Sequence, residues 1–284
     1  MAKHDKVLKE VLKKVRPTKE QRRKIEGLSR KALAVTSKIA KRHNAKAILA
    51  GSITRDTWMP DKNEFDVFVL FPESLKEKKM ESLGLQIGKA AISKLKGEAV
   101  VEYAEHPYVS GKADGVGIDV VPCFELSSTE KLKSAVDRTP FHVKYIEKNL
   151  PFRLSDDVRL LKQFLAAHGI YGADAKTEGF SGYVCELLIV AYKSFINALK
   201  AAVNWQAGEI VDIEKFYSKD DYAKLRENFK NQILVLIDPI DKNRNTAAAL
   251  SSKNFFKFKK YAQEFMANPS SEMFFPQELQ PITH

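Results

Sequence analysis

Leu49-Ala-Gly-Ser52 and, after an interval of eleven residues, Glu64-Phe-Asp-Val67 are the stretches that decide the fold of this 284-residue chain. Alternate residues of a strand face the same side, so Glu64 and Asp66 project together from one face of a predicted strand. Two like charges on one face are costly unless a cation neutralises them, and oxygen ligands without His or Cys suit Mg²⁺. The pattern therefore predicts a strand that carries two ligands of a metal site.

A third carboxylate and a glycine turn extend this prediction. Asp119 lies between two apolar residues of another predicted strand, and it would complete a site for two ions if the strands are neighbours. Gly51 and Ser52 follow a strand directly, so the backbone N–H groups and the hydroxyl of a tight turn could hold phosphate oxygens. Each feature alone is common on ordinary surfaces. Together, and in this order, they predict nucleotidyl transfer.

The surrounding pattern predicts an α+β fold: a head with a small mixed β-sheet and flanking helices, followed by a mostly helical central domain. We place these domains at residues 1–148 and 149–284, with a cleft between them. Helices are expected at 7–15, at 18–39 with a capping box of Thr18 and Gln21, at 76–96, at 155–169 with Ser155 as the cap, at 183–203 and at 254–266. Strands are expected at 47–50, 65–71, 100–104, 108–110 and 116–121, with an isolated one at 233–237.

Composition excludes several protein classes. The longest apolar run, residues 183–192, is interrupted by Glu186 and is too short to cross a bilayer, and the first thirty residues lack the pattern of a secretory signal. The two cysteines, Cys123 and Cys185, lie among apolar residues, which excludes a disulfide framework and a Cys-based zinc site. We therefore expect a cytoplasmic protein, with no membrane span, whose cysteines are buried free thiols.

The net charge of +11 is concentrated at the N-terminus. Residues 1–46 hold sixteen Lys and Arg against four Asp and Glu, so they carry a net +12 while the remainder sums to −1. A basic segment of this kind is either the solvated face of helices or a surface that contacts nucleic-acid phosphates. Composition alone leaves both interpretations open.

The motifs of this sequence resemble those of a known family. Gly-Ser followed by acidic-hydrophobic-acidic is the signature of the nucleotidyltransferase (DNA polymerase β-like) superfamily, and longer runs resemble the archaeal, class I CCA-adding tRNA nucleotidyltransferases. These runs are Gly51-Ser-Ile-Thr-Arg-Asp-Thr57, Glu105-His-Pro-Tyr108, Asp119-Val-Val-Pro-Cys123, Ala135-Val-Asp-Arg-Thr-Pro-Phe-His142, Arg159-Leu-Leu-Lys162, Gly169-Ile-Tyr-Gly172, Gly179-Phe-Ser-Gly-Tyr183 and Asp238-Pro-Ile-Asp241.

The resemblance implies roles for the matching residues. The catalytic, metal-binding carboxylates would be Glu64, Asp66 and Asp119, holding two Mg²⁺ ions. Gly51, Ser52 and Arg55 would bind the incoming triphosphate; Thr139, His142, Lys162 and Tyr171 would contact its phosphates or sugar; and Arg244 would help read the base of CTP or ATP. From the residues alone, His142 could equally be a core histidine, Lys162 a solvated helix residue and Arg244 a loop charge.

The implied activity is template-independent addition of CMP and AMP to the tRNA 3′ end, with CTP, ATP and the tRNA acceptor stem as partners. Alternatives are addition of CC or A only, a different acceptor such as another RNA end, a protein or a small molecule, and a non-catalytic RNA-binding module. A P-loop ATPase is excluded because the nearest motif, Gly84 to Ala90, has a short glycine gap and lacks the final hydroxyl. Family members continue into a body and tail region, so this chain is either a fragment or a natural short form. Its oligomeric state stays open.

Overall fold

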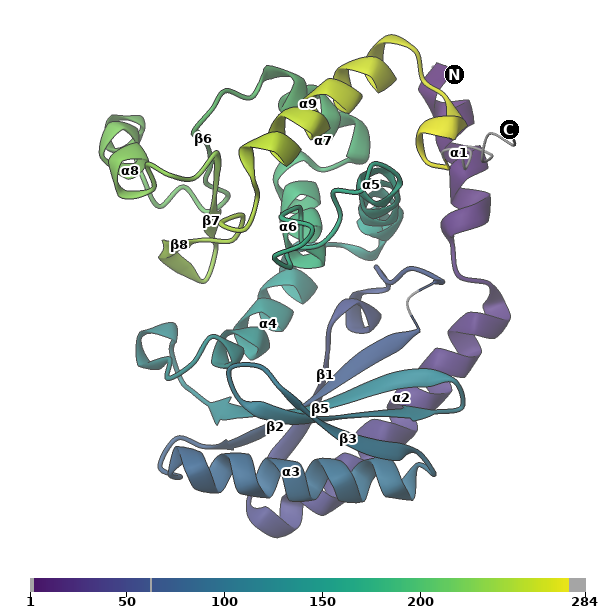
Figure 1. Cartoon of the computed structure of the whole chain (residues 1–284), viewed down its shortest axis with the longest axis vertical. Helices are drawn as coiled ribbons and strands as arrows, with labels where there is room; N and C mark the ends of the chain where they lie inside the picture. The colour runs from purple at the N-terminus through teal and green to yellow at the C-terminus, as the bar shows by residue number, and fades with distance from the viewer. Residues whose placement is uncertain (1–2, 62, 276–284) are drawn as a thin grey trace, which may run out of the picture. The chain divides into compact units, whose positions relative to one another are not determined.

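The computed structural model describes residues 3–61 and 63–275, which form two compact units. The first, Pro17–Lys148, is called the sheet unit here, and the second, Met1–Arg16 with Asn149–His284, the helical unit. The α+β fold expected from the sequence is confirmed: a mixed sheet with flanking helices is followed by mostly helical structure (Figure 1).

The sheet unit is built on five strands in the order β1-β2-β5-β4-β3. Their bounds are β1 Lys46–Ala50, β2 Glu64–Pro72, β3 Glu98–Tyr103, β4 Pro107–Ala113 and β5 Val116–Glu125. The central pair, β2 and β5, is parallel, whereas β1, β4 and β3 each pair antiparallel with their neighbours. The apolar positions between the acidic ones, such as Phe65 and Ile118, are buried in the core. The two acidic strands are neighbours, which is the condition on which the predicted site depends.

One face of this sheet is covered by α2 (Lys19–Ala40) and α3 (Glu77–Lys94), which share a core with the buried strand residues (Figure 1). The capping box of Thr18 and Gln21 that begins α2 is present as predicted. A Cβ on Gly84 would lie 2.5 Å from the side chain of Pro122, and a Cβ on Gly88 would lie 2.7 Å from that of Val109. These α3 glycines therefore let the helix pack closely on the sheet.

The opposite face is covered at one end by α4 (Thr139–Asn149). Its Val143 packs in a small cluster with Phe68 of β2 and Cys123 of β5. Because side chains alternate along a strand, Asp66 and Asp119 lie on this same face, closer to the start of their strands. The carboxylates thus share a face with α4.

The helical unit contains six helices among the described residues, and a three-stranded sheet in the order β6-β7-β8. The helices are α1 Lys3–Val15, α5 Ser155–Ala167, α6 Gly182–Tyr192, α7 Phe195–Asn204, α8 Tyr222–Asn228 and α9 Ser252–Ala267. The strands are β6 Glu209–Val211, β7 Leu234–Asp238 and β8 Asp241–Asn245. Short 3₁₀ turns include Ser52–Arg55 and Val136–Arg138 in the sheet unit and Phe152–Leu154 and Ser271–Met273 in the helical unit.

Three predicted elements of the helical unit differ from the structure. The helix expected at 183–203 is two helices, α6 and α7, bent by 92°, because Lys193 adopts a left-handed conformation (φ 66°) and Ser194 caps α7. The strand expected to be isolated, β7, pairs with β6 and β8. Ser155 is the first residue of α5 rather than its cap, because a 3₁₀ turn leads directly into the helix.

Helix α1 groups with the helical unit, whereas the sequence pattern predicted it to be part of the head at residues 1–148. The two units divide between Lys148 and Asn149, and Met1–Arg16 groups with the second unit. The reason is local: Val11 and Val15 are buried, and Arg16 Nε lies 3.0 Å from the Asp156 carboxylate at the start of α5. Pro17 then separates α1 from α2.

The two cysteines are buried free thiols, as expected, and burial raises the pKa of Cys185 to about 12. Among the described residues, no single helix is long and apolar enough to cross a membrane; α6 and α7 pass the length and composition test only as a bent pair.

Candidate active site

The three carboxylates are positioned by strand register. Asp66 of β2 is the partner of Asp119 of β5, and on its other side Asp66 faces Ala50, the last residue of β1. Glu64 lies two residues before Asp66 and is exposed, whereas the two aspartates are half-buried. The register therefore places the two aspartates side by side on one sheet face.

The glycine turn that follows β1 lies against the same carboxylate. Gly51 has a positive φ of 76°, and a Cβ on it would lie 2.7 Å from Asp66 Oδ2. A side chain here would be strained by the positive φ and would push the carboxylate aside, so glycine suits this turn. The turn and the acidic pair, separated in the sequence, form one local site.

The pKa of Asp66 reflects its burial first and its acidic neighbours second. Burial, followed by the charges of Asp119 and Glu64, raises the pKa of Asp66 from its ordinary value of 3.8 to about 6, although the charge of Arg55 opposes this shift. A carboxylate with so high a pKa favours a neutralising cation. The donor set is oxygen only, which fits a hard divalent cation.

The turn carrying Ser52 and Arg55 is fastened to α2. The Thr54 hydroxyl donates to the Gly51 carbonyl at 3.2 Å, and the Thr57 N–H donates to the Ser52 carbonyl at 3.0 Å. Asp56, in a left-handed conformation at the end of the turn, forms an ion pair with Arg22 of α2. The sequence pattern did not single out this ion pair, because its two partners are 34 residues apart.

Two of the residues predicted to bind the nucleotide lie on α4. Thr139 is its first residue, and His142 follows one turn later. Both side chains are half-buried. His142 is therefore not a core histidine, whereas the neighbouring Val143 is buried in the core. The segment before α4 is held by the buried carboxylate of Asp137, which accepts hydrogen bonds from the N–H groups of Phe124 at 2.8 Å and Ser134 at 3.0 Å. This contact ties the start of α4 to the end of β5.

In the helical unit, Lys162 and Tyr171 converge on the first residue of α6. A Cβ on Gly182 would lie 3.2 Å from the Tyr171 hydroxyl and 3.7 Å from Lys162 Nζ. Lys162 is only 3% exposed, so it is not a solvated helix residue. An ammonium group and a phenol beside a helix N-terminus form an arrangement suited to an anion such as phosphate.

Arg244, on β8, is paired with a buried acid. Its Nη1 lies 2.7 Å from Asp238 Oδ2, and Asp238 is fully buried, whereas the Arg244 side chain is 35% exposed. The Tyr183 hydroxyl of α6 lies 3.4 Å from the other carboxylate oxygen. Arg244 is therefore held in place rather than being a mobile loop charge. Asp238 and Tyr183 occur in motifs quoted above, but their contacts could not be read from the sequence.

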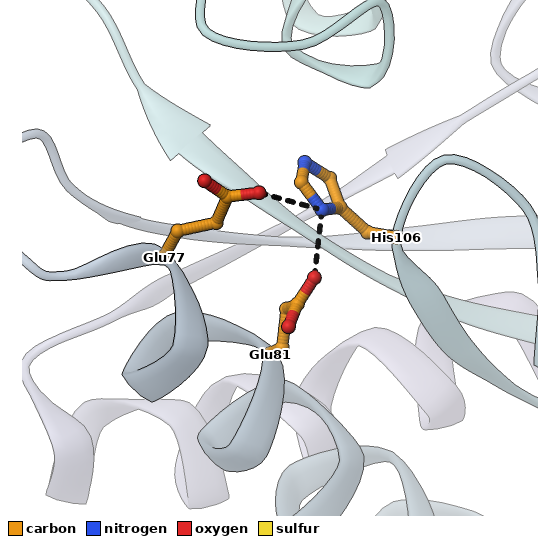
Figure 2. Close-up of side chains that lie close together, drawn as sticks. All are labelled: Glu77, Glu81 and His106. Carbon is orange, nitrogen blue, oxygen red and sulfur yellow. Dashed lines mark hydrogen bonds and ion pairs between the residues drawn. The ribbon is translucent and has the colours of Figure 1, made fainter.

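A second acidic cluster lies elsewhere in the sheet unit. Figure 2 shows Nδ1 of His106 facing Glu81 and Glu77 of α3, at 3.0 and 3.7 Å. Among the described residues, these three side chains form a group whose possible metal-ligand atoms all lie within 4.8 Å of one another. The ligand atoms of Glu64, Asp66 and Asp119 do not all lie that close together. In the same turn, Glu105 accepts a hydrogen bond from the Ala135 N–H at 2.8 Å. The cluster fastens the turn between β3 and β4 to α3.

Comparison with known proteins assigns a domain to each part of the chain. Residues 30–142 match the family model described as nucleotidyltransferase domain, and residues 156–275 match the model described as tRNA nucleotidyltransferase, second domain. The CCA-adding enzyme of Methanocaldococcus jannaschii is 45% identical over 279 residues, covering 95% of this chain and 61% of that protein. That of Archaeoglobus fulgidus is 40% identical, covering 98% of this chain and 60% of that protein. The chain thus spans about three fifths of these relatives.

Solved structures support the fold. A cytoplasmic RNA terminal U-transferase aligns with a TM-score of 0.70 at 14% identity, covering 99% of this chain and 100% of that one. The polymerase core of TRAMP, an RNA surveillance complex, aligns with a TM-score of 0.62 at 17% identity, covering 95% and 88%. At such low identity the likeness concerns the arrangement of the elements.

Proposed function

We propose that this chain, which is similar to the CCA-adding enzymes of Methanocaldococcus jannaschii and Archaeoglobus fulgidus, adds CMP and AMP to the 3′ end of tRNA without a nucleic-acid template. The terminal 3′ hydroxyl of the acceptor attacks the α-phosphate of CTP or ATP, a phosphodiester bond forms, and pyrophosphate leaves. The observation that carries the proposal is the register of β2 and β5, which aligns Asp66 with Asp119 beside the Gly51 turn.

Glu64, Asp66 and Asp119 are proposed to hold two Mg²⁺ ions. The raised pKa of Asp66 and the oxygen-only donor set both fit a cation in this place. When bound, the ions would supply neutralisation of the triphosphate and activation of the attacking hydroxyl. No covalent enzyme intermediate is needed, so the chain contributes mainly by positioning the reacting groups.

The remaining predicted residues are proposed to bind the nucleotide. In the sheet unit, Ser52 and Arg55 would contact the triphosphate, and Thr139 and His142 would contact its phosphates or sugar. In the helical unit, Lys162 and Tyr171 fit the same chemistry, because they converge at the start of α6. Arg244 would read the base with its planar set of donors.

The acceptor is proposed to be the tRNA acceptor stem. The basic residues of positions 1–46 would contact its phosphates, and they lie mainly on α1 of the helical unit and α2 of the sheet unit. Such contacts make affinity dependent on salt.

The deciding experiment incubates the purified chain with tRNA lacking its 3′ CCA, Mg²⁺ and labelled CTP or ATP. Extension by three nucleotides is the expected result, and Asp119→Asn in the same preparation should give none. Extension by CC only, or by A only on tRNA ending in CC, would mean that the chain adds only that part of the CCA end. A folded, nucleotide-binding chain that extends no tRNA would contradict the proposal.

A further inference from the structure

Strands β7 and β8 form a hairpin in the helical unit (Figure 1). It holds a fully buried carboxylate, that of Asp238. Asp238 ends β7, at an irregularity in the pairing between β7 and β8. One oxygen, Oδ2, lies 2.7 Å from Arg244 Nη1. The other, Oδ1, lies 3.4 Å from the Tyr183 hydroxyl and accepts the Ile240 N–H at 3.2 Å. Both oxygens are therefore engaged.

A buried aspartate of this kind is costly unless its charge is paired, and Arg244, which pairs with it, is only partly buried. The ion pair holds the Arg244 guanidinium at Nη1, while a third of the side chain reaches solvent. Because the guanidinium is planar and rigid, a contact at one end sets the direction of its other N–H donors. Asp238 thus determines where Arg244 can donate hydrogen bonds.

The same carboxylate lies close to the start of α6, through its contact with Tyr183. Tyr183, which contacts Asp238, directly follows Gly182, where Lys162 and Tyr171 converge. A chain of contacts within the helical unit therefore runs from the start of α6 through Tyr183 and Asp238 to Arg244. It links the groups suited to phosphate with the group suited to a base edge.

We propose that Asp238 is a positioning residue for nucleotide selection: it holds the Arg244 fork at a set place relative to the start of α6, so that CTP and ATP are accepted and UTP and GTP are rejected. The proposal rests on the base-reading role of Arg244 in the proposed function. Asp238 itself does not touch the nucleotide.

The test compares kcat/KM for CTP with that for UTP, and for ATP with that for GTP, in Asp238→Asn and in the parent. The variant keeps the size of the side chain and removes its charge, so the ratios should fall by about tenfold, with UTP and GTP accepted better relative to the parent. Lys242→Gln is the matched control, because it removes an exposed charge from the same hairpin and should leave both ratios unchanged. A purely structural role would lower kcat/KM for all four nucleotides by one common factor, and that result would overturn the proposal.

Arg244→Ala separates the two levels of the argument. If it leaves both ratios unchanged, the base-reading role is wrong and the positioning role falls with it. If it relaxes selection but Asp238→Asn does not, only the positioning role is wrong. If both relax selection, the double variant should be no less selective than Arg244→Ala alone, because Asp238 acts through Arg244.

Tyr183→Phe keeps the test decisive should Asp238→Asn fail to fold. It removes one donor to the same carboxylate and leaves the buried charge paired with Arg244. The expected ratios fall in the same direction by a smaller factor, and unchanged ratios in this variant, with normal binding of CTP, would count against the chain of contacts.

Discussion

At the scale of single residues, Asp66 couples stability to the chemistry of the site. Its pKa of about 6 in the folded chain exceeds its ordinary 3.8, so the metal-free folded state binds more protons than the unfolded state between these values. Stability without metal should therefore fall as pH rises from about 4 to about 6, by up to about 3 kcal/mol. Asp66→Asn should remove this loss and raise the melting temperature in EDTA at pH 7, while abolishing nucleotide addition.

The measurement is thermal unfolding in EDTA across this pH range. Asp114→Asn serves as the control, since it neutralises an exposed acid of the same unit in a conformation that asparagine tolerates. A melting temperature of Asp66→Asn that follows the parent at every pH would show that burial and the neighbouring acids do not destabilise the charged form of Asp66.

Arg22 and Arg23 are adjacent residues that we expect to act differently. Arg22 pairs with Asp56 behind the Ser52 turn, whereas Arg23 is exposed. Arg22→Gln should loosen the turn and raise the KM for CTP and for ATP roughly fivefold, equivalent to about 1 kcal/mol. Arg23→Gln should leave both KM values unchanged. Equal KM values for the two variants would remove Arg22 from the triphosphate site.

At the scale of elements, α1 is held mainly by two buried valines. Val11→Ala should destabilise the docking of α1 by about 2 kcal/mol, because it opens a cavity at a fully buried position. Limited proteolysis near Pro17 should then become faster. Lys13→Ala, on the exposed side of the same helix, should not change the rate of cleavage. Equal rates in both variants would mean that α1 is not anchored through Val11.

The elements also show what a sequence can and cannot reveal. Strands β2 and β5 and the Gly51 turn were predictable, because alternation and turn residues are local signals. The break at Lys193 was not, since neither glycine nor proline marks it, and a lysine adopts the left-handed conformation there. The convergence of Lys162 and Tyr171 on Gly182, and of Tyr183 and Arg244 on Asp238, depends on packing between distant segments. No local sequence pattern predicts that these side chains meet.

At the scale of the whole molecule, the basic residues of positions 1–46 should govern affinity for RNA. Charge reversal of Lys13, Lys19 and Arg23, all exposed, should weaken tRNA binding and flatten its dependence on salt, by about 0.9 in the slope of log K against log salt for each duplex phosphate that is no longer neutralised. Binding of CTP and ATP should not change. Filter binding at several salt concentrations measures this, and identical slopes for variant and parent would identify a merely solvated helix face.

The grouping of α1 with the later part of the chain has a consequence during synthesis on the ribosome. The ribosome synthesises Arg16 140 residues before its partner Asp156. At a translation rate of about 5–20 residues per second, α1 waits roughly 7–28 s before its docking site exists. The sheet unit is one continuous stretch of the chain, Pro17–Lys148, so it can complete its fold during that interval. The nascent chain should therefore pass through a stage in which α1 is a free amphipathic helix available to chaperones.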